Sequence, residues 1–433
     1  MADTDVIVIG AGISGLSTSW FLHAGGADIR LIEASDRIGG VITTVRKDGF
    51  LLEQGPNTTL QKPGREEDAI GRLMEGAGLS MIAREASPLG KHRFILRDGV
   101  VRALPTSPPA FLGTRAFSWR AKARLMAEPF IGRAGSEETI AQFVKRRLGR
   151  EFLDYAIDPF VSGVYAGDTK RLSVRAAVPR IHDLEAKYGS LIRGAIALGK
   201  AAKNAGMPAG RQVSFSDGME AFPKGIADRL PANAILRSTR VVSLEPTKKG
   251  WRVETQSPNG PTTLTAKNVV LALPADSTAE LIRPLAPEAA RSIESIPYVS
   301  IVSAGLGYES DQIYHDLDGF GFLVPRAEGV RTLGALFSSS LFNGRAPDGH
   351  VLLTAFIGGA HDPEAIELTD DELTDRLNDD LAKTLGISGF PCFRCLSRWK
   401  KAIPQYEIGH LHRVAEIDRD LSGHAGLYLR GNW

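Results

Sequence analysis

The glycines near the start of the chain have the type and spacing that bind phosphate. The segment reads Gly10, Ala11, Gly12, Ile13, Ser14 and Gly15, which matches the pattern GxGxxG. In this pattern the first glycine permits a tight turn, the second lets a pyrophosphate approach the backbone, and the third lets a helix pack closely on a strand. Glycine is common, so the pattern indicates a nucleotide site only in the right structural context.

The flanking residues supply that context. The apolar run at residues 5–9 predicts a buried strand, a helical pattern follows at residues 14–24, and a second strand predicted at residues 28–33 ends in Glu33. Such a unit turns the helix N-terminus, with its free N–H groups, toward the phosphates. A carboxylate at Glu33 can accept hydrogen bonds from both ribose hydroxyls, and it would repel the 2′-phosphate of NADP.

Two further motifs favour FAD over NAD. The segments SDRIGG at residues 35–40 and FLLEQGPN at residues 50–57 resemble consecutive motifs of the flavin amine oxidase superfamily. The resemblance implies that Arg37 approaches the pyrophosphate and that residues 55–58 lie beside the isoalloxazine ring. The further FAD contacts that it implies are Arg37, Gly39, Gly40, Val41, Gly55, Pro56, Asn57, Thr58 and Val241. A structural glycine turn after an NAD-binding fold is the alternative.

Segments along the whole chain are similar to one branch of that superfamily, the protoporphyrinogen and coproporphyrinogen oxidases. They are residues 160–180, 214–230, 269–275, 319–325, 333–347 and 403–410. The resemblance implies an FAD-dependent oxidase of haem biosynthesis that converts protoporphyrinogen IX to protoporphyrin IX with dioxygen as acceptor. Coproporphyrinogen III as substrate, another flavin amine oxidase reaction, and a flavin-free non-catalytic fragment stay open as alternatives.

The same resemblance implies a tetrapyrrole site on five residues. Arg93 matches the propionate-binding arginine, whose planar fork suits a carboxylate. Phe320, Leu323 and Phe356 match the walls around the macrocycle, and Gly163 matches a glycine whose carbonyl lies near the reacting edge. A surface arginine and plain core residues are the alternatives. No catalytic acid or base is expected, because aromatisation drives the reaction and the protein positions the substrate.

The order of helical and strand patterns predicts an α/β protein with interleaved domains. A Rossmann-like FAD-binding domain is expected at residues 1–90, 212–290 and 396–433. A mixed-sheet substrate domain is expected at residues 91–105 and 291–395, and a helical, membrane-facing insertion at residues 106–211. Within the substrate domain, Thr369 and Glu372 form a capping box and Gly386 marks the end of the helix that begins there.

The composition limits which partners and metal ions the sequence predicts. The net charge of +2 gives no reason to expect a nucleic-acid partner. Cys392 and Cys395 read as reduced thiols on a strand, and His410 and His412, which could share a strand face, lack a third ligand, so no metal is expected.

The sequence gives less information about the cellular location and the oligomeric state. No secretory signal or spanning segment is visible, which favours a cytoplasmic protein. Residues 186–211 carry basic and no acidic side chains, and residues 115–124 add basic and aromatic ones. These stretches indicate either peripheral contact with the inner membrane or a solvated face. A homodimer and a monomer both stay open.

The end of the chain carries one expectation. The porphyrinogen oxidases continue past a GNW-like segment with a glycine-rich turn and a helix that completes the flavin site, whereas this sequence ends at Trp433. We therefore expect residues 1–433 alone to hold FAD weakly and to oxidise porphyrinogen poorly.

Overall fold

The computed structural model describes residues 3–64, 68–105, 108–204 and 209–433. One sheet has the strand order β10-β2-β1-β13-β12-β11, with β19 also paired to β13. Its strands are β1 Thr4–Ile9, β2 Ile29–Ile32, β10 Ile235–Leu236, β11 Arg240–Thr247, β12 Gly250–Ser257, β13 Gly260–Leu271 and β19 Leu427–Leu429. The pairs among β10, β2, β1, β13 and β19 are parallel, as the dinucleotide motif predicts.

Helices cover both faces of this sheet, and the buried side chains of β1 point alternately to the two faces. Val6 and Val8 belong to the core under α1, α2 and α11, and Ile7 and Ile9 belong to the core under α12, α13 and α16. The helices are α1 Ile13–Ala24, α2 Ala69–Gly76, α11 Ala221–Ala227, α12 Ala275–Ile282, α13 Pro287–Glu294 and α16 His410–Leu421.

The second sheet is mixed and has the order β18-β14-β17-β16-β15-β7-β8. Its strands are β7 Phe94–Arg97, β8 Val100–Ala103, β14 Tyr298–Glu309, β15 Gly321–Leu323, β16 Gly334–Leu336, β17 His350–Gly358 and β18 Phe393–Pro404. Helix α15, Asp370–Leu385, packs on one face of it. The predicted capping box of Thr369 and Glu372 begins this helix, and Gly386 ends it with φ +68°.

A hairpin joins the two sheets. It consists of β3, Thr44–Lys47, and β4, Phe50–Glu53. Glu53 at its end forms a buried ion pair of 2.6 Å with Arg345, which follows the short helix α14, Ser338–Leu341. Burial lowers the pKa of Arg345, but the Glu53 carboxylate next to it supports the charged form. The ion pair therefore holds the hairpin against the second sheet.

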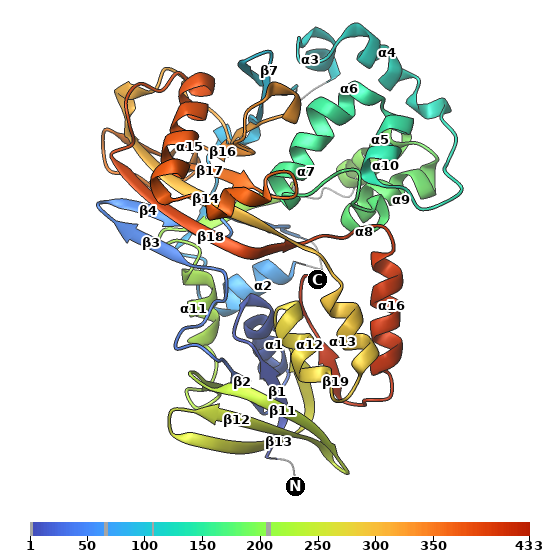
Figure 1. The fold of residues 1–433 in the computed structure, drawn as a ribbon, viewed down its shortest axis with the longest axis vertical. Helices are drawn as coiled ribbons and strands as arrows, with labels where there is room; N and C mark the ends of the chain where they lie inside the picture. The colour runs from blue at the N-terminus through green and yellow to red at the C-terminus, as the bar shows by residue number, and fades with distance from the viewer. Residues whose placement is uncertain (1–2, 65–67, 106–107, 205–208) are drawn as a thin grey trace.

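The segment between β8 and β9 is helical, as predicted (Figure 1). Its elements are α3 Pro108–Gly113, α4 Trp119–Met126, the 3-10 turn η2 Glu128–Phe130, α5 Ile140–Arg147, α6 Arg150–Phe152, the π-helical turn η3 Leu153–Ile157, α7 Asp158–Tyr165, α8 Val174–Ala177, α9 Pro179–Tyr188 and α10 Leu191–Asn204. No helix in the described ranges is long and apolar enough to cross a membrane.

A buried ionic network lies at the centre of this helical insertion. Arg147 of α5 is fully buried and bonds both Glu128, at 3.0 Å, and Glu185 of α9. Burial alone would raise the pKa of Glu128, but Ser190, the first N–H groups of α10 and Arg147 bond its carboxylate and lower it. The network ties η2, α5, α9 and α10 together.

Several details differ from the sequence predictions. His410 and His412 begin α16 rather than sharing a strand face, and no cluster of metal-ligating side chains is found among the described residues. Lys122 is buried because its ammonium donates to two carbonyls, so it is no part of a basic surface. Arg211 lies outside the insertion, on β9. The small sheet that contains β9 consists of β5 Thr59–Gln61, β9 Arg211–Phe215 and β6 Ala83–Glu85.

We expect Glu128→Gln to lower the free energy of unfolding by about 3 kcal/mol, because the substitution leaves the buried Arg147 to share the carboxylate of Glu185 with Arg146. The matched control is Glu288→Gln, which removes an exposed ion pair with Arg291 and should cost less than about 0.5 kcal/mol. Denaturant unfolding of both variants at neutral pH measures the difference. Equal small effects would contradict the structural role of the network.

The same network predicts acid sensitivity. Because the pKa of Glu128 and that of Glu185 lie below their ordinary values, their stabilisation is complete at neutral pH and is lost as pH falls through the folded-state pKa. Glu128→Gln should therefore lose less stability on acidification than the wild-type chain.

Candidate functional site

The glycine motif forms an open cradle at the carboxyl end of β1. Gly10 has φ +100°, and a Cβ there would lie 2.4 Å from the Ala272 carbonyl oxygen. A Cβ on Gly15 would lie 1.8 Å from the Gly10 oxygen, so this position packs helix on strand. At Gly12 the situation differs: the nearest atom to an added Cβ is 4.0 Å away, so the space beside it is free for a ligand. Gly12 is also the N-cap of α1, and no side chain caps the helix.

A cavity of about 230 Å³ adjoins the cradle. Gly10, Glu33 and Val241, three of the predicted cofactor residues, line it together. The Glu33 carboxylate accepts hydrogen bonds from the Ala11 N–H at 2.8 Å and the Ser35 N–H at 2.9 Å. Oε1 of Glu33 also accepts the Ser35 hydroxyl at 2.8 Å, whereas Oε2 keeps one lone pair for a ribose hydroxyl. The cavity thus fits the adenosine end of a dinucleotide.

The second predicted motif runs directly along the cradle. Gly39 pairs with Gly12 as an isolated bridge, and its N–H donates to the Ala11 oxygen at 2.8 Å. A Cβ on Gly40 would lie 3.2 Å from the Gly12 Cα. The guanidinium of Arg37 donates to the carbonyl oxygens of its own turn, that of Gly40 included, and its approach to a pyrophosphate stays a prediction.

The turn after β4 continues the path toward the second sheet. A Cβ on Gly55 would lie 2.1 Å from the oxygen of Val41, whose side chain is exposed. Pro56 is exposed, and Asn57 and Thr58 are half-buried. The indole N–H of Trp399, on β18, donates to the carbonyl oxygen of Gln54 at 3.1 Å. The predicted cofactor residues therefore form one continuous strip from the first sheet to the second.

The strip meets the sheet face that carries the predicted substrate walls. Leu323, Gly334, Phe356 and Ser303 pair in sequence across β15, β16, β17 and β14, so they lie in one row on one face. Gly334 has no side chain, so Leu323 and Phe356 are the large apolar side chains of this row, and Leu323 Cδ2 lies 3.4 Å from where a Cβ on Gly334 would be. Gly305, two residues after Ser303, points the same way and contacts Leu52 of the hairpin.

Helix α7 forms the adjoining wall. A Cβ on Gly163 would lie 2.4 Å from Leu323 Cδ2, so the helix backbone approaches the sheet there. The buried carboxylate of Asp158, at the start of α7, bonds the guanidinium of Arg326 just after β15 at 2.9 Å. This ion pair fixes α7 relative to the row that contains Leu323.

Arg93 lies over the ring of Phe320, with 4.4 Å from its guanidinium carbon to the ring centroid. The residue is exposed, yet partial desolvation of its guanidinium lowers the pKa of Arg93, which stays charged. Within the described ranges it forms no ion pair with an acidic side chain, whereas Arg97 pairs with both Asp98 and Glu151. Arg93 is therefore available to an anionic ligand, and Phe320 holds its guanidinium in place.

Gln405 was not among the predicted site residues, although it lies in residues 403–410, a segment that resembles the porphyrinogen oxidases. Its buried amide donates to the carbonyl oxygen of Tyr165, at the end of α7, at 2.9 Å. Gln405 also lines a cavity of about 360 Å³ together with Ser300 and Gly359. Residues 403–410 indicated this position from the sequence, but the hydrogen bond from Gln405 to Tyr165 depends on the fold.

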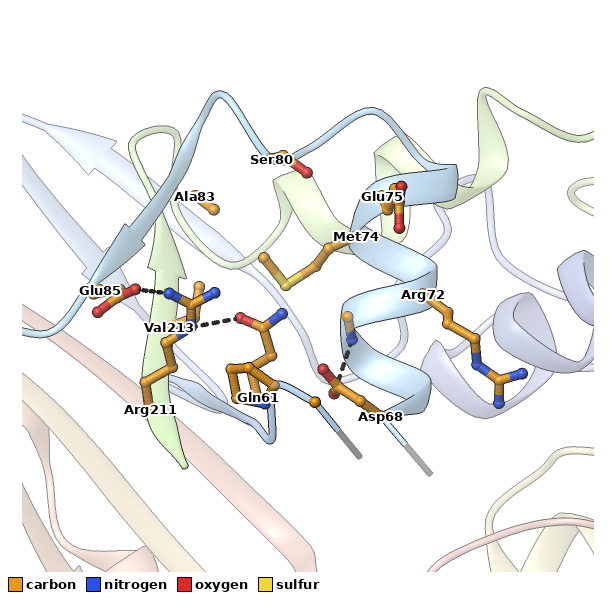
Figure 2. Close-up of a pocket in the computed structure, with 13 residues that line it drawn as sticks. Gln61, Asp68, Arg72, Met74, Glu75, Ser80, Ala83, Glu85, Arg211 and Val213 are labelled. Carbon is orange, nitrogen blue, oxygen red and sulfur yellow. Dashed lines mark hydrogen bonds and ion pairs between the residues drawn. The ribbon is translucent and has the colours of Figure 1, made fainter. Parts of the chain in front are cut away.

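Another cavity, of about 530 Å³, lies between α2 and the small sheet (Figure 2). Arg211 bonds Glu85 and Gln61 across it, and Asp68 caps α2. The charged Arg72 extends away from it toward Phe21. None of the predicted cofactor or substrate residues lines this cavity, so it is separate from the strip.

The geometry of the cradle predicts that a substitution at Gly12 affects FAD binding, whereas one at Gly15 affects folding. Gly12→Ala should leave the unfolding temperature unchanged, because φ −70° suits alanine and the added Cβ meets no atom closer than 4.0 Å. It should nevertheless weaken FAD binding to the apoprotein by at least tenfold. Gly15→Ala is the matched control and should destabilise the fold, because its Cβ overlaps the Gly10 oxygen. Titration calorimetry and thermal unfolding measure both; full FAD affinity in Gly12→Ala would contradict the assignment.

Known proteins support the arrangement. The family model for flavin-containing amine oxidoreductases matches residues 13–433. The chloroplastic protoporphyrinogen oxidase of Nicotiana tabacum is 34% identical, covering 100% of this chain and 82% of that protein. The coproporphyrinogen III oxidase of Bacillus subtilis (strain 168) is 27% identical, covering 98% and 93%.

Solved structures share the fold. A crystal structure from Exiguobacterium sp. 255-15 matches with a TM-score of 0.80 at 24% identity, covering 100% of this chain and 94% of that one. The cyclohexylamine oxidase of Brevibacterium oxydans IH-35A matches with a TM-score of 0.71 at 18% identity, covering 99% and 93%. The chain thus belongs to the family of flavin-containing amine oxidoreductases, and it is an oxidoreductase with FAD as its cofactor.

Proposed function

We propose that this enzyme oxidises protoporphyrinogen IX to protoporphyrin IX in porphyrin biosynthesis, with dioxygen as the final acceptor. FAD supplies the hydride acceptor when it is bound. The observation that carries the proposal is the row of Leu323, Gly334 and Phe356, on the sheet face that also contacts the hairpin leading to Gly55. A flat aromatic side chain such as that of Phe356 suits a planar macrocycle.

The residues proposed for the substrate act by positioning. Arg93 would bind a propionate at the rim, and Phe320, Leu323 and Phe356 would border the ring system. Gly163 brings the backbone of α7 against Leu323 and so would border the proposed site on that side. Binding energy gathered in this way holds the reacting carbon near the flavin, which by itself lowers the barrier.

Coproporphyrinogen III is the second candidate, because relatives such as the Bacillus subtilis protein carry that activity in their names. It has four propionates where protoporphyrinogen has two. Arg93 is the single unpaired arginine that we identify beside the proposed walls, and one such cation suits the substrate with fewer carboxylates. Aerobic incubation of the FAD-loaded protein with each porphyrinogen, read by porphyrin fluorescence, tests the proposal. A faster rate with coproporphyrinogen, or no porphyrin from either, would overturn it.

We also propose a peripheral contact with the inner membrane through residues 119–130 of the insertion. Trp119, Met126 and Phe130 are 74%, 68% and 85% exposed, and the exposed Arg120 lies among them. Exposed aromatic side chains beside a cation suit an anionic lipid surface, and a membrane would be a source of the apolar substrate.

We expect Arg93→Ala to raise KM for porphyrinogen by tenfold or more while kcat changes little, because a propionate contact far from the reacting carbon stabilises ground and transition states alike. Arg102→Ala, on β8, is the control and should change neither constant. Steady-state rates on both variants measure the effect. A large fall in kcat at an unchanged KM would argue against the propionate role.

For the membrane contact, the double substitution Trp119→Asp with Phe130→Asp should reduce co-sedimentation with anionic vesicles several-fold. Tyr314→Asp, at a 91% exposed position on the substrate domain, should have no effect. Undiminished vesicle binding by the double variant would remove residues 119–130 as the contact.

A further inference from the structure

The helical insertion contains an apolar cavity of about 590 Å³ that is partly open to solvent. Helices α5, α7, α8 and α9 and the start of α10 surround it. This volume lies within the range of about 300–1,000 Å³ that is common for small-molecule sites. Helix α7 separates the cavity from the substrate walls, because Val161 lines the cavity whereas Gly163, about 160° away around the helix, contacts Leu323.

The lining is almost entirely hydrocarbon. Among the described residues around the cavity, Arg180 is the one charged side chain, and the floor is made of side chains such as Phe143, Val161 and Leu191. The hydroxyl of Tyr165 donates to the Ala177 oxygen at 2.7 Å, so this residue presents its ring to the interior. Such an interior offers water few hydrogen bonds and favours an apolar occupant.

The ionic network behind the cavity keeps its walls apart. Arg147, at the end of α5, bonds Glu185 of α9, and Glu128 accepts from the first N–H groups of α10. An unfilled apolar cavity normally costs stability, and helices that were free to move would close it. Helices held by charged groups cannot do so easily, so the cavity is preformed.

The rim supplies one cation. Arg180 is exposed, and within the described part of the chain it forms no ion pair or side-chain hydrogen bond. We propose that the cavity binds a free long-chain fatty acid, with the alkyl chain inside and the carboxylate on Arg180. A single cation matches a single carboxylate, and one partly open cavity of this volume suits one alkyl chain. This site does not depend on the proposed porphyrinogen activity.

The test uses the FAD-loaded protein and monomeric decanoate, dodecanoate and tetradecanoate in titration calorimetry. Affinity should rise roughly tenfold with each two added methylene groups, because each one transfers from water to the apolar interior. Affinity that does not change with chain length would overturn the proposal.

Matched substitutions locate the site. Ile181→Glu, at the 42% exposed rim, should weaken dodecanoate binding at least tenfold, whereas Ile196→Glu, 54% exposed on α10 outside the lining, should not. Arg180→Gln should weaken binding, and Arg175→Gln, another exposed arginine, should not. All four positions are exposed enough to tolerate substitution. Equal losses in both isoleucine variants, accompanied by equal losses of binding to phosphatidylglycerol vesicles, would mean a lipid-facing surface and would overturn the cavity site.

Discussion

The contact between two backbones at Gly12 and Gly39 is the constraint on which the rest of the site depends. The two residues pair as a bridge, and the Gly39 N–H bonds the Ala11 oxygen. A side chain at Gly10 or Gly15 would collide with backbone within 2.4 Å, so the approach of strand, helix and turn is possible only with glycine. Because the helix N-terminus then faces open space, we propose that the phosphates of FAD bind there and that the flavin extends along the turn at Gly55.

The direction of that extension is set by the ion pair of Glu53 and Arg345. Both side chains are at most 4% exposed, and Glu53 also accepts the N–H of Met219 at 2.9 Å. Losing either partner would leave a buried charge without compensation. The pair therefore couples the dinucleotide fold to the second sheet and sets the distance from Gly55 to the wall at Phe356. A hydride transfer requires that distance to be short, so the domain junction serves the chemistry directly.

Local patterns predicted those parts of the molecule whose causes are local. The cradle at Gly12 and the carboxylate at Glu33 follow from strand and helix periodicity, and helix α15 follows from its capping box at Thr369. The row of Leu323 and Phe356 could not be derived in this way, because strand register depends on pairing between distant segments. Resemblance to known porphyrinogen oxidases indicated these residues individually, but not that Gly334 would separate them.

Buried charged side chains and local backbone conformation also could not be predicted from the sequence. The basic stretch around Lys122 predicted a surface, yet its ammonium is satisfied by two carbonyl oxygens in the interior. His410 and His412 were expected on a strand and begin α16 instead, because the preceding Gly409 adopts φ +84° and starts the helix. In both cases a partner distant in sequence or a backbone conformation decided the outcome, and neither is visible in residue type alone.

The central claim is that a porphyrinogen held against Phe356 reduces the flavin held by the Gly12 cradle. Anaerobic mixing of the FAD-loaded protein with protoporphyrinogen IX, followed in the visible absorption of the flavin, tests it most directly. Each FAD accepts one of the three electron pairs that protoporphyrinogen IX must lose. We therefore expect the flavin colour to bleach anaerobically, and the flavin colour to return and porphyrin absorption to appear on admission of air. A flavin that stays oxidised in the presence of excess protoporphyrinogen would contradict the account.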